Sequence, residues 1–488
     1  MFWEEQLYET RLIIDGQHIS PAPSAAFERR GPSSDVVVTR AAAARASDAR
    51  DAAASAARAF DQWSKSQHGD RVAVLECAAA LMEANVDEIV QIAADEIGSS
   101  PDWVKFNVEI AASMLRQTRD LVEALEPERQ VGSAYLVRRR PAGVVLGIAP
   151  WNAAVTLATR AVAAPLACGN TAILKGSELC PKTHEWVARM LNAAGLPDGV
   201  LNYVTNAPDH AEEVVEALIS YPAVRRVNFT GSTRVGRQIA VIAAGHLKPC
   251  LLELSGKGTM IVLADADLDR AATAAAYGSF FNQGQICMST ERIVVVDSVA
   301  DDFVARFRTE TDKLRFRAGH QPLGALISSN AAVRVGAMIE DAVSRGATLV
   351  TGGELSGGGI QPAIVDNVGP GMRLFDEEAF GPVAGVIRVQ DRDEALAIAN
   401  DTEFGLVASI FTWDTDLALS MLDDIETGIG HINGSTVYDD PTMPFGGVKS
   451  SGYGRFGGLE ALREFTECQW IAIHDTDGSE TTTDNDVL

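Results

Sequence analysis

One cysteine stands in a sequence that suits a nucleophile. Cys287 lies in the stretch Phe280–Thr290, FFNQGQICMST, two residues after the polar, glycine-containing turn Gln283–Gln285. Such a turn can present a thiol to a cleft, and a thiol suits attack on an aldehyde because even a fraction of thiolate is strongly nucleophilic. The alternative interpretation is a small core residue, which is what most isolated cysteines are. The six cysteines are scattered without a C-x-x-C pair, and H-E-x-x-H spacing is absent, so a metal site is not expected.

A glutamate inside an apolar stretch is the candidate general base. Glu253 is flanked by leucines in the segment Leu251–Lys257, LLELSGK. A carboxylate at the end of a hydrophobic strand is costly unless it is paired or used. Burial should raise its pKa, which makes it a plausible proton acceptor near neutral pH. The alternative is a structural salt bridge with Lys257.

An asparagine at the end of a predicted strand is the candidate oxyanion donor. Asn152 closes the stretch Gly147–Asn152, GIAPWN. Its side-chain amide can donate to an oxyanion without itself carrying charge. As the N-cap of the following helix, the same residue would need no catalytic role.

Two further strand ends carry residues suited to a dinucleotide. Lys175 and Glu178 end the stretch AILKGSE, where a carboxylate can accept hydrogen bonds from ribose hydroxyls and the lysine can bond the same sugar. The segment Phe229–Ser232, FTGS, is followed by Gly236, and glycines at such a strand-to-helix turn let the backbone approach a pyrophosphate. The segment Gly452–Gly457 matches G-x-G-x-x-G, but no apolar strand precedes it, so we interpret it as a structural loop.

The elements that must position these residues alternate between strand and helix. Short apolar runs predict strands at 144–149, 171–175, 200–205, 224–229 and 251–254, and helical spacing between them predicts helices at 153–167, 181–194, 210–219 and 235–244. Strict alternation predicts a parallel α/β sheet with helices on both faces. In such a sheet the ligand binds beyond the carboxyl ends of the strands.

The flanking regions predict helices, a second domain and an arm. Residues 41–94 have the spacing of amphipathic helices, and a second alternating series after residue 254 predicts another α/β domain. Residues 136–140 and 470–473 are β-rich outside both series, so we expect them to pair as an arm between subunits. The tail at 475–488 contains acids and threonines but no Lys or Arg, which is typical of disorder.

Composition limits the class of protein. A chain of 488 residues should form two or more domains, and 47% apolar with 22% charged residues is an ordinary globular profile. The net charge of −25 opposes binding to nucleic acid or an anionic membrane. No signal peptide is readable, and the longest apolar stretch is interrupted by Arg160 and Pro165, so we expect a cytoplasmic protein without a membrane span.

Taken in order, these motifs resemble the aldehyde dehydrogenase superfamily over nearly the whole chain. The matching pieces are PWN at 150–152, KGSE at 175–178, FTGS at 229–232, ELSGK at 253–257, GQIC at 284–287, EAFGP at 378–382 and PFGGVK at 444–449. The resemblance implies a Rossmann-like cofactor-binding domain at 1–132 and 142–253. It also implies an α/β catalytic domain at 254–466 and a β oligomerisation arm at 133–141 and 467–474, which would make the protein a homodimer or homotetramer.

The resemblance also implies roles for individual residues. It makes Cys287 the nucleophile, Glu253 the base and Asn152 an oxyanion donor. The resemblance also implies cofactor binding by Ile148, Ala149, Pro150, Trp151, Lys175, Ser177, Glu178, Phe229, Thr230, Gly231, Ser232, Val235, Leu254, Glu378 and Phe380. One departure from the family pattern is Ser255, where the family usually has glycine. The Cβ of this serine lies next to the base in sequence and could restrict how the Glu253 side chain moves.

The implied substrate is a small aldehyde. Segments around the motifs, such as RRVNFTGSTRVG, look most like those of bacterial salicylaldehyde, vanillin and benzaldehyde dehydrogenases. Trp103 could stack on an aromatic ring, and Arg160 could bond a ring hydroxyl. The alternatives are a core aromatic and a buried structural ion pair.

The implied reaction is oxidation to the carboxylic acid through a thioester on Cys287. Glu178 would repel a 2′-phosphate and favours NAD, although Gly176 and Ser177 leave room for NADP. Other interpretations are an aliphatic or semialdehyde dehydrogenase, one that transfers the acyl group to CoA, and a non-catalytic protein on the same fold. The presence of Glu253 argues against CoA transfer, because thiolysis needs no water-activating carboxylate.

Overall fold

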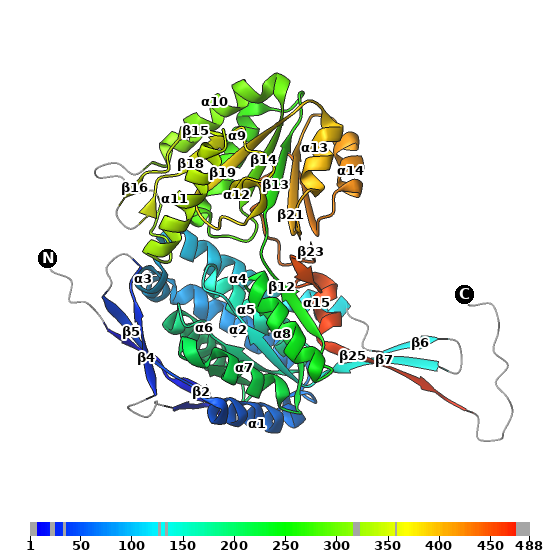
Figure 1. Cartoon of the computed structure of the whole chain (residues 1–488). Coiled ribbons are helices and arrows are strands. Elements are labelled where there is room, and N and C mark those ends of the chain that lie inside the picture. Colours follow the sequence, from blue (N-terminus) through cyan, green and yellow to red (C-terminus); the bar gives the residue numbers. More distant parts are fainter. Residues whose placement is uncertain are drawn as a thin grey trace.

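The computed structural model describes residues 7–19, 25–32, 36–124, 128–131, 135–315, 323–356 and 359–474. They form two lobes, each built on one large sheet, and a thin arm that leaves the first lobe (Figure 1). The predicted α/β fold class is confirmed. The tail predicted to be disordered, 475–488, lies outside the described residues.

The first lobe contains an eight-stranded sheet with a parallel centre. In spatial order its strands are β24 (Gly452–Tyr453), β12 (Cys250–Glu253), β11 (Val224–Thr230), β8 (Val144–Ile148), β9 (Thr171–Lys175), β10 (Leu201–Val204), β2 (Leu12–Ile14) and β3 (Gln17–Ile19). The central strands β12 to β10 are parallel, and β24, β2 and β3 are antiparallel edges. The strands β8, β9 and β10 are buried throughout, which is why they read as apolar runs without polar alternation.

Helices cover both faces of this sheet, as alternation predicts. One face packs on α2 (His68–Ala84), α3 (Val86–Ile97), α4 (Pro101–Ala124), α5 (Ala154–Ala167) and α6 (Pro181–Ala193). The other packs on α1 (Ala46–Trp63), α7 (Ala211–Ser220) and α8 (Thr233–Gly245). The observed bounds agree with the predicted ranges to within a few residues.

The second lobe repeats the plan with a seven-stranded sheet. Its spatial order is β15 (Thr348–Thr351), β18 (Ala363–Asp366), β19 (Val383–Val389), β14 (Thr290–Val296), β13 (Gly258–Val262), β21 (Val407–Phe411) and β22 (Ile429–Ile432), and only β15 is antiparallel. Its helices are α9 (Leu268–Phe280), α10 (Asp297–Lys313), α11 (Ser329–Ser344), α12 (Arg373–Asp376), α13 (Arg392–Asn400) and α14 (Thr415–Asp424).

The arm is a three-stranded antiparallel sheet that projects from the first lobe (Figure 1). It contains β6 (Glu128–Val131), β7 (Tyr135–Pro141) and β25 (Thr466–Ala472), with Trp470 opposite Val137. The predicted pairing of the two β-rich segments is therefore observed, and β6 adds a strand from the range assigned by resemblance to the cofactor-binding domain.

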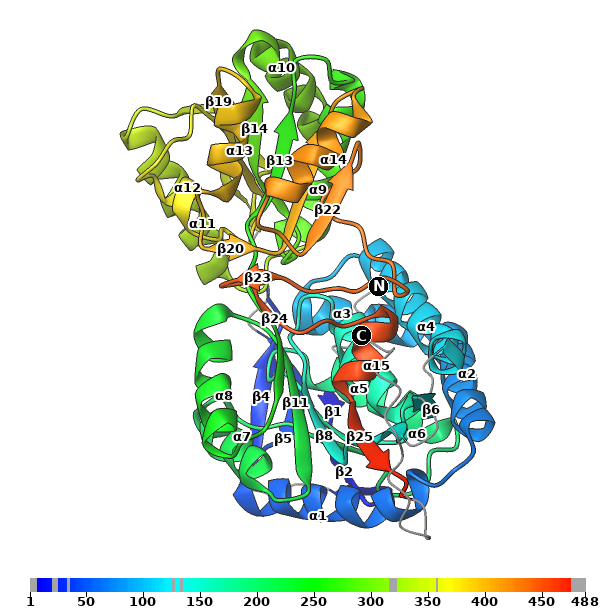
Figure 2. The same ribbon diagram turned by 90° about the vertical axis from the view of Figure 1, so that its right-hand side faces the viewer.

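The chain returns to the first lobe before it enters the arm. After β22 it passes through β23 (Val448–Lys449) between the lobes, and α15 (Gly458–Glu464) then lies against α4 and α5 (Figure 2). Residues 452–464, within the predicted catalytic range, thus pack on the first lobe. The segment interpreted as a loop forms β24 and the turn into α15, and Gly452 has φ +110°, where a Cβ would collide with the Leu252 carbonyl oxygen.

Short elements complete the described chain. They are β1 (Tyr8–Glu9), β4 (Ala26–Arg30), β5 (Val37–Ala42), η1 (Pro208–His210), η2 (Phe281–Gly284), β16 (Leu355–Ser356), β17 (Gly359–Ile360) and β20 (Phe404–Gly405).

Candidate active site

A cleft with about 310 Å³ of free space opens between the lobes at the carboxyl ends of the first sheet's parallel strands. From the first lobe it is lined by Pro150, Trp151, Asn152, Leu157, Thr230, Gly231, Ser232, Leu254 and Ser255. From the second lobe it is lined by Cys287, Arg334, Glu378 and Phe380. Cys287, Asn152 and Ser232, which the sequence singled out, therefore line one cleft. Lys175 and Glu178, also predicted from the sequence, are not among its lining residues.

Cys287 lies in this cleft on a loop with an unusual backbone. Residues 282–284, just after α9, have φ values of 47°, 57° and 68°. The left-handed conformation costs a non-glycine residue about 1–2 kcal/mol, so contacts must hold the loop. Gln285 does so, because its Oε1 accepts from the Ile327 N–H at 2.9 Å. Behind the loop, a Cβ at Gly256 would collide with the Cys287 carbonyl oxygen, so glycine is needed for this close approach.

Glu253 faces the thiol from the end of β12. The distance from Cys287 Sγ to Glu253 Oε2 is 3.8 Å, and Glu253 is only 1% exposed. Burial raises the pKa of Glu253 to about 8, and burial followed by the charge of Glu253 raises the pKa of Cys287. Glu253 Oε1 accepts no hydrogen bond from any described residue. The alternative salt bridge does not form, because Lys257 pairs with Glu291 at 2.9 Å.

Asn152 is held by both its backbone and its side chain. Its carbonyl oxygen accepts from Trp103 Nε1 at 2.9 Å and from Asn282 Nδ2 at 3.2 Å. Its own Nδ2 donates to the Gln285 carbonyl oxygen at 3.0 Å, which leaves the second amide hydrogen for another acceptor. The N-cap of α5 is Ala153, not Asn152, so the capping interpretation does not describe this residue.

The end of β9, which lies beside β8 in the first sheet, suits an anionic, hydroxyl-rich ligand. Lys175 is 6% exposed, and the charge of Glu178 acts on its ammonium without a direct ion pair among the described residues. Burial lowers its pKa, and a buried cation of this kind needs oxygen acceptors. Glu178 lies half-buried three residues further along the chain. Ser232 caps α8 by accepting from the Val235 N–H at 3.5 Å, so the positive end of this helix lies at the edge of the cleft.

The other predicted cofactor residues surround this end. Ala149 donates its N–H to the Lys175 carbonyl oxygen at 3.3 Å, which joins the two strand ends. Ser177 is buried, and its hydroxyl accepts from the Leu179 N–H at 3.2 Å. The side chains of Ile148, Phe229, Val235 and Leu254 belong to the apolar core between the sheet and α8.

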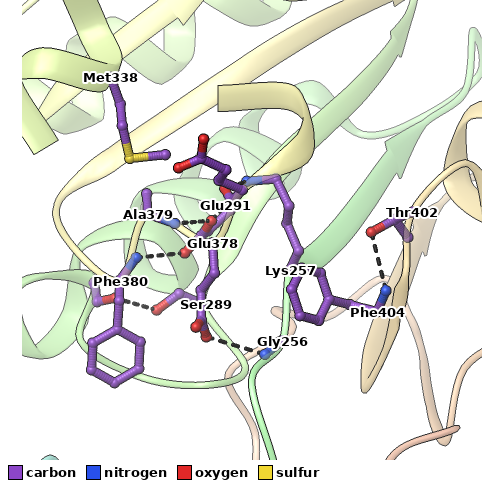
Figure 3. Close-up of polar contacts among 12 residues, drawn as sticks. Gly256, Lys257, Ser289, Glu291, Met338, Glu378, Ala379, Phe380, Thr402 and Phe404 are labelled. Atoms are coloured by element: carbon purple, nitrogen blue, oxygen red, sulfur yellow. Dashed lines mark hydrogen bonds and ion pairs between the residues drawn. The ribbon is translucent and has the colours of Figure 1, made fainter. Parts of the chain in front are cut away.

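Glu378 enters the cleft from the second lobe on a tightly held loop (Figure 3). Its carboxylate accepts from the Gly256 N–H at 3.1 Å and also from the hydroxyl of Ser255. The buried pair of Lys257 and Glu291 supports the loop, because Glu291 accepts from the N–H of Phe380 at 2.9 Å. Burial raises the pKa of Glu378 to about 7. The Phe380 backbone has φ 45°, so its ring position is imposed by these contacts.

Comparisons with known proteins identify the family of this cleft. The model described as "Aldehyde dehydrogenase family" matches residues 19–471. The chain belongs to the aldehyde dehydrogenase family. A vanillin dehydrogenase of Pseudomonas fluorescens is 48% identical to this aldehyde dehydrogenase over 474 residues, covering 96% of this chain and 98% of that protein.

Solved structures agree with this assignment. The crystal structure of a salicylaldehyde dehydrogenase from Pseudomonas putida G7, complexed with salicylaldehyde, has a TM-score of 0.93 and 42% identity, covering 96% of this chain and 99% of that chain. An NAD-dependent aldehyde dehydrogenase from Sinorhizobium meliloti has a TM-score of 0.91 and 33% identity, covering 96% of this chain and 95% of that chain. The predicted resemblance and the predicted enzyme class, an oxidoreductase acting on aldehydes, are confirmed.

The two predicted substrate residues of this aldehyde dehydrogenase take different positions. Trp103 is 4% exposed and packs edge-on against Phe281, with ring centroids 5.0 Å apart, so it is both a core aromatic and a donor to the Asn152 carbonyl. Arg160 forms a buried ion pair with Asp439 and lies 4.3 Å from the Phe445 ring centroid. The alternative interpretation of Arg160, a buried ion pair, therefore describes its contacts. The pair lines a second cavity.

Several residues that build the site carry no signal in the sequence alone. Asn282 and Gln285 hold Asn152, Glu291 holds the Phe380 backbone, and Arg334 lines the cleft and donates to the Glu378 carbonyl oxygen at 3.2 Å. The only available hint was position, since Gln285 belongs to the polar turn before Cys287 and Asn282 immediately precedes that turn.

Along the part of the chain that the structure describes, no helix is both long and apolar enough to cross a membrane.

Proposed function

We propose that this enzyme oxidises an aromatic aldehyde to the carboxylic acid with NAD, or NADP, as the hydride acceptor. Cys287 Sγ bonds to the carbonyl carbon, and the resulting oxyanion accepts hydrogen bonds from the Asn152 amide and a backbone N–H. A bound nicotinamide dinucleotide supplies the acceptor for the hydride that this carbon loses. Glu253 then takes a proton from water, whose oxygen displaces the sulfur of the thioester and releases the acid and the Cys287 thiol.

The single observation that carries this proposal is the contact between Cys287 and Glu253. A thiol and a carboxylate 3.8 Å apart, at a strand end beside Asn152, combine a nucleophile, a base and an oxyanion donor. A pKa of about 8 places Glu253 close to neutral pH, where a general base works best. Glu253 is also placed to take the proton of the thiol, whose pKa is raised.

The cofactor proposal is supported by residues at the ends of β9 and β11 and on the loop of the second lobe that contains Glu378. Lys175 and Glu178 would bond the adenosine ribose, and the start of α8 at Gly231 and Ser232 would face the pyrophosphate. Glu378 would hold the nicotinamide ribose, and Phe380, whose ring lies 5.8 Å from that of Trp151, would pack near the nicotinamide.

The aromatic substrate is supported by the relatives and by the side chains near the thiol. The relatives described above are named for vanillin and salicylaldehyde. Trp103, Phe106 and Phe281 form an aromatic group in contact with the Asn152 loop, with ring centroids between 5.0 and 5.9 Å apart. Such a group favours a flat ring in the substrate.

An aldehyde panel followed at the absorbance of the reduced nicotinamide, with both cofactors, tests the proposal. We expect a higher kcat/KM for benzaldehyde-type substrates than for short aliphatic aldehydes, and no requirement for CoA. Cys287→Ala should abolish turnover, whereas Glu253→Gln should release one burst of reduced cofactor per site and then stall. Full steady-state activity in either variant would refute the assigned role.

We further propose the subunit organisation implied by the resemblance. The first lobe would bind the cofactor, the second lobe would carry catalysis at 254–466, and the arm would join subunits into a homodimer or homotetramer in the cytoplasm. The exposed aromatic residues of the arm support this, since Trp470 is 69% exposed and packs against Tyr135 with ring centroids 5.9 Å apart. The mass in solution, measured with and without residues 467–474, tests the arm.

A further inference from the structure

A second, partly open cavity with about 40 Å³ of free space lies in the first lobe and contains one buried ion pair. Helices α4 and α5 form one wall, and the segment 439–445 and the start of α15 form the other. Much of the lining is apolar, including Met114, Ala163, Ala164, Phe445, Phe456 and Leu462. The polar exceptions that matter here are Arg160 and Asp439, whose side chains are 7% and 10% exposed.

Asp439 uses only one of its two carboxylate oxygens. Its Oδ2 pairs with an Nη atom of Arg160, whereas Oδ1 is buried and accepts no hydrogen bond from any residue that the structure describes. Arg160 lies over the Phe445 ring at 4.3 Å, which holds its guanidinium in place. Leaving a buried acceptor unsatisfied is costly, so a donor from a ligand would be bound favourably at Oδ1.

This ion pair is close to the reacting groups. The charges of Arg160 and Asp439 both act on the pKa values of Glu253 and Cys287, Arg160 lowering and Asp439 raising them. Cys287 also packs on the apolar cluster that contains Phe445, which forms a wall of the cavity. The cleft and this cavity share no lining residue, so a ring whose carbonyl carbon lies at the thiol would reach Asp439 along this cluster.

We propose that Asp439 Oδ1 accepts a hydrogen bond from a hydroxyl group on the aromatic ring of the substrate, with Arg160 positioning the carboxylate. This inference rests on the proposed function and adds to it a substrate class, the phenolic aldehydes. The apolar lining suits the ring, and the free acceptor suits a hydroxyl donor. A substrate that has a negatively charged group at the end away from the aldehyde is disfavoured, because Asp439 and the neighbouring Asp440 outnumber Arg160 at this cavity.

The experiment compares each hydroxybenzaldehyde isomer with benzaldehyde and with the matching methoxybenzaldehyde, which keeps the oxygen but lacks the donor. In the wild-type enzyme, at least one hydroxybenzaldehyde should have a higher kcat/KM than both controls. A double variant, Arg160→Met with Asp439→Leu, removes the acceptor without leaving an unpaired buried charge. We expect it to lower the preference for the hydroxyl about 10- to 100-fold, mainly through KM, as for loss of a hydrogen bond to a charged group.

Two further variants separate this role from a structural one. Asp439→Asn keeps the shape and a neutral acceptor, so we expect a smaller loss of about 3- to 10-fold in the same ratio. Asp440→Asn is the matched control, because it removes one charge from the same cavity while Asp440 Oδ1 is already bonded to the Thr442 hydroxyl at 2.7 Å. It should keep the ratio of hydroxybenzaldehyde to benzaldehyde.

The possible outcomes are distinct. If the double variant keeps the wild-type ratio, or if Asp440→Asn lowers the ratio as much as Asp439→Asn does, the inference is wrong while the proposed function stands. If the double variant shows no cooperative thermal transition, Asp439→Asn decides the question. If the wild-type enzyme oxidises no aromatic aldehyde, the proposed function itself is wrong.

Discussion

Replacing Glu253 with glutamine should make this aldehyde dehydrogenase more stable at alkaline pH while it removes the proposed base. Glu253 is 1% exposed at the end of β12, and its Oε1 accepts no hydrogen bond from the described side chains or backbone. A folded enzyme with an ionised Glu253 therefore contains a carboxylate that is poorly solvated. Glutamine has nearly the same shape and no charge, so it removes this cost.

The magnitude follows from the pKa. Burial raises the pKa of Glu253 from 4.5 to about 8, so ionisation costs the folded state on the order of 4–5 kcal/mol relative to the unfolded chain. The folded enzyme holds the proton up to about pH 8, whereas the unfolded chain releases it near pH 4.5. The stabilising effect of the neutral carboxyl is thus complete below pH 4.5 and is lost as the pH rises to 8.

The assay is urea unfolding of the wild-type enzyme and Glu253→Gln at about pH 5 and about pH 9, outside most of this titration. At about pH 5 the free energy of unfolding of the variant should exceed that of the wild-type enzyme only slightly. At about pH 9 the difference should be larger by about 3–5 kcal/mol. Glu96→Gln is the contrasting control, because the buried Glu96 carboxylate accepts from the Thr39 hydroxyl at 2.7 Å and from the N–H and hydroxyl of Thr183, both at 2.8 Å. Its replacement should destabilise the enzyme. An equal effect of Glu253→Gln at both pH values would show that burial does not set this pKa.

Three further substitutions test the positioning of the site. Asn152→Ala should lower kcat about 100- to 1,000-fold with little change in the aldehyde KM, and a change in KM alone would contradict an oxyanion role. Trp103→Phe keeps the ring but removes the Nε1 donor to the Asn152 carbonyl, so kcat should fall about 3- to 10-fold, and an unchanged kcat would assign Trp103 to packing alone. Glu178→Gln should raise kcat/KM for NADP relative to NAD about tenfold, measured with both cofactors at saturating aldehyde, because a carboxylate repels a 2′-phosphate. An unchanged ratio would place Glu178 away from the adenosine ribose.

The architecture was largely readable from local patterns. Strands such as β8 and β9 are buried on both faces and so appear as short apolar runs, and the helices between them have a 3.6-residue spacing. The placement of β24 and α15 was not readable, because a two-residue edge strand and a seven-residue helix give almost no periodic signal. Their position depends on packing against β12, α4 and α5.

For the candidate site, too, the sequence predicted one part and tertiary packing decided the other. The sequence by itself determined which residue types follow the predicted strands and the polar turn. Cys287, Glu253 and Asn152 could therefore be named as a nucleophile, a base and an oxyanion donor. Tertiary structure alone decided the contacts between segments that are distant in sequence. It placed Lys257 on Glu291 instead of Glu253, and it paired Arg160 with Asp439, 279 positions away. The reason is physical: strand and helix patterns arise from neighbouring residues, whereas burial, pairing and pKa depend on which distant atoms share a low-dielectric interior.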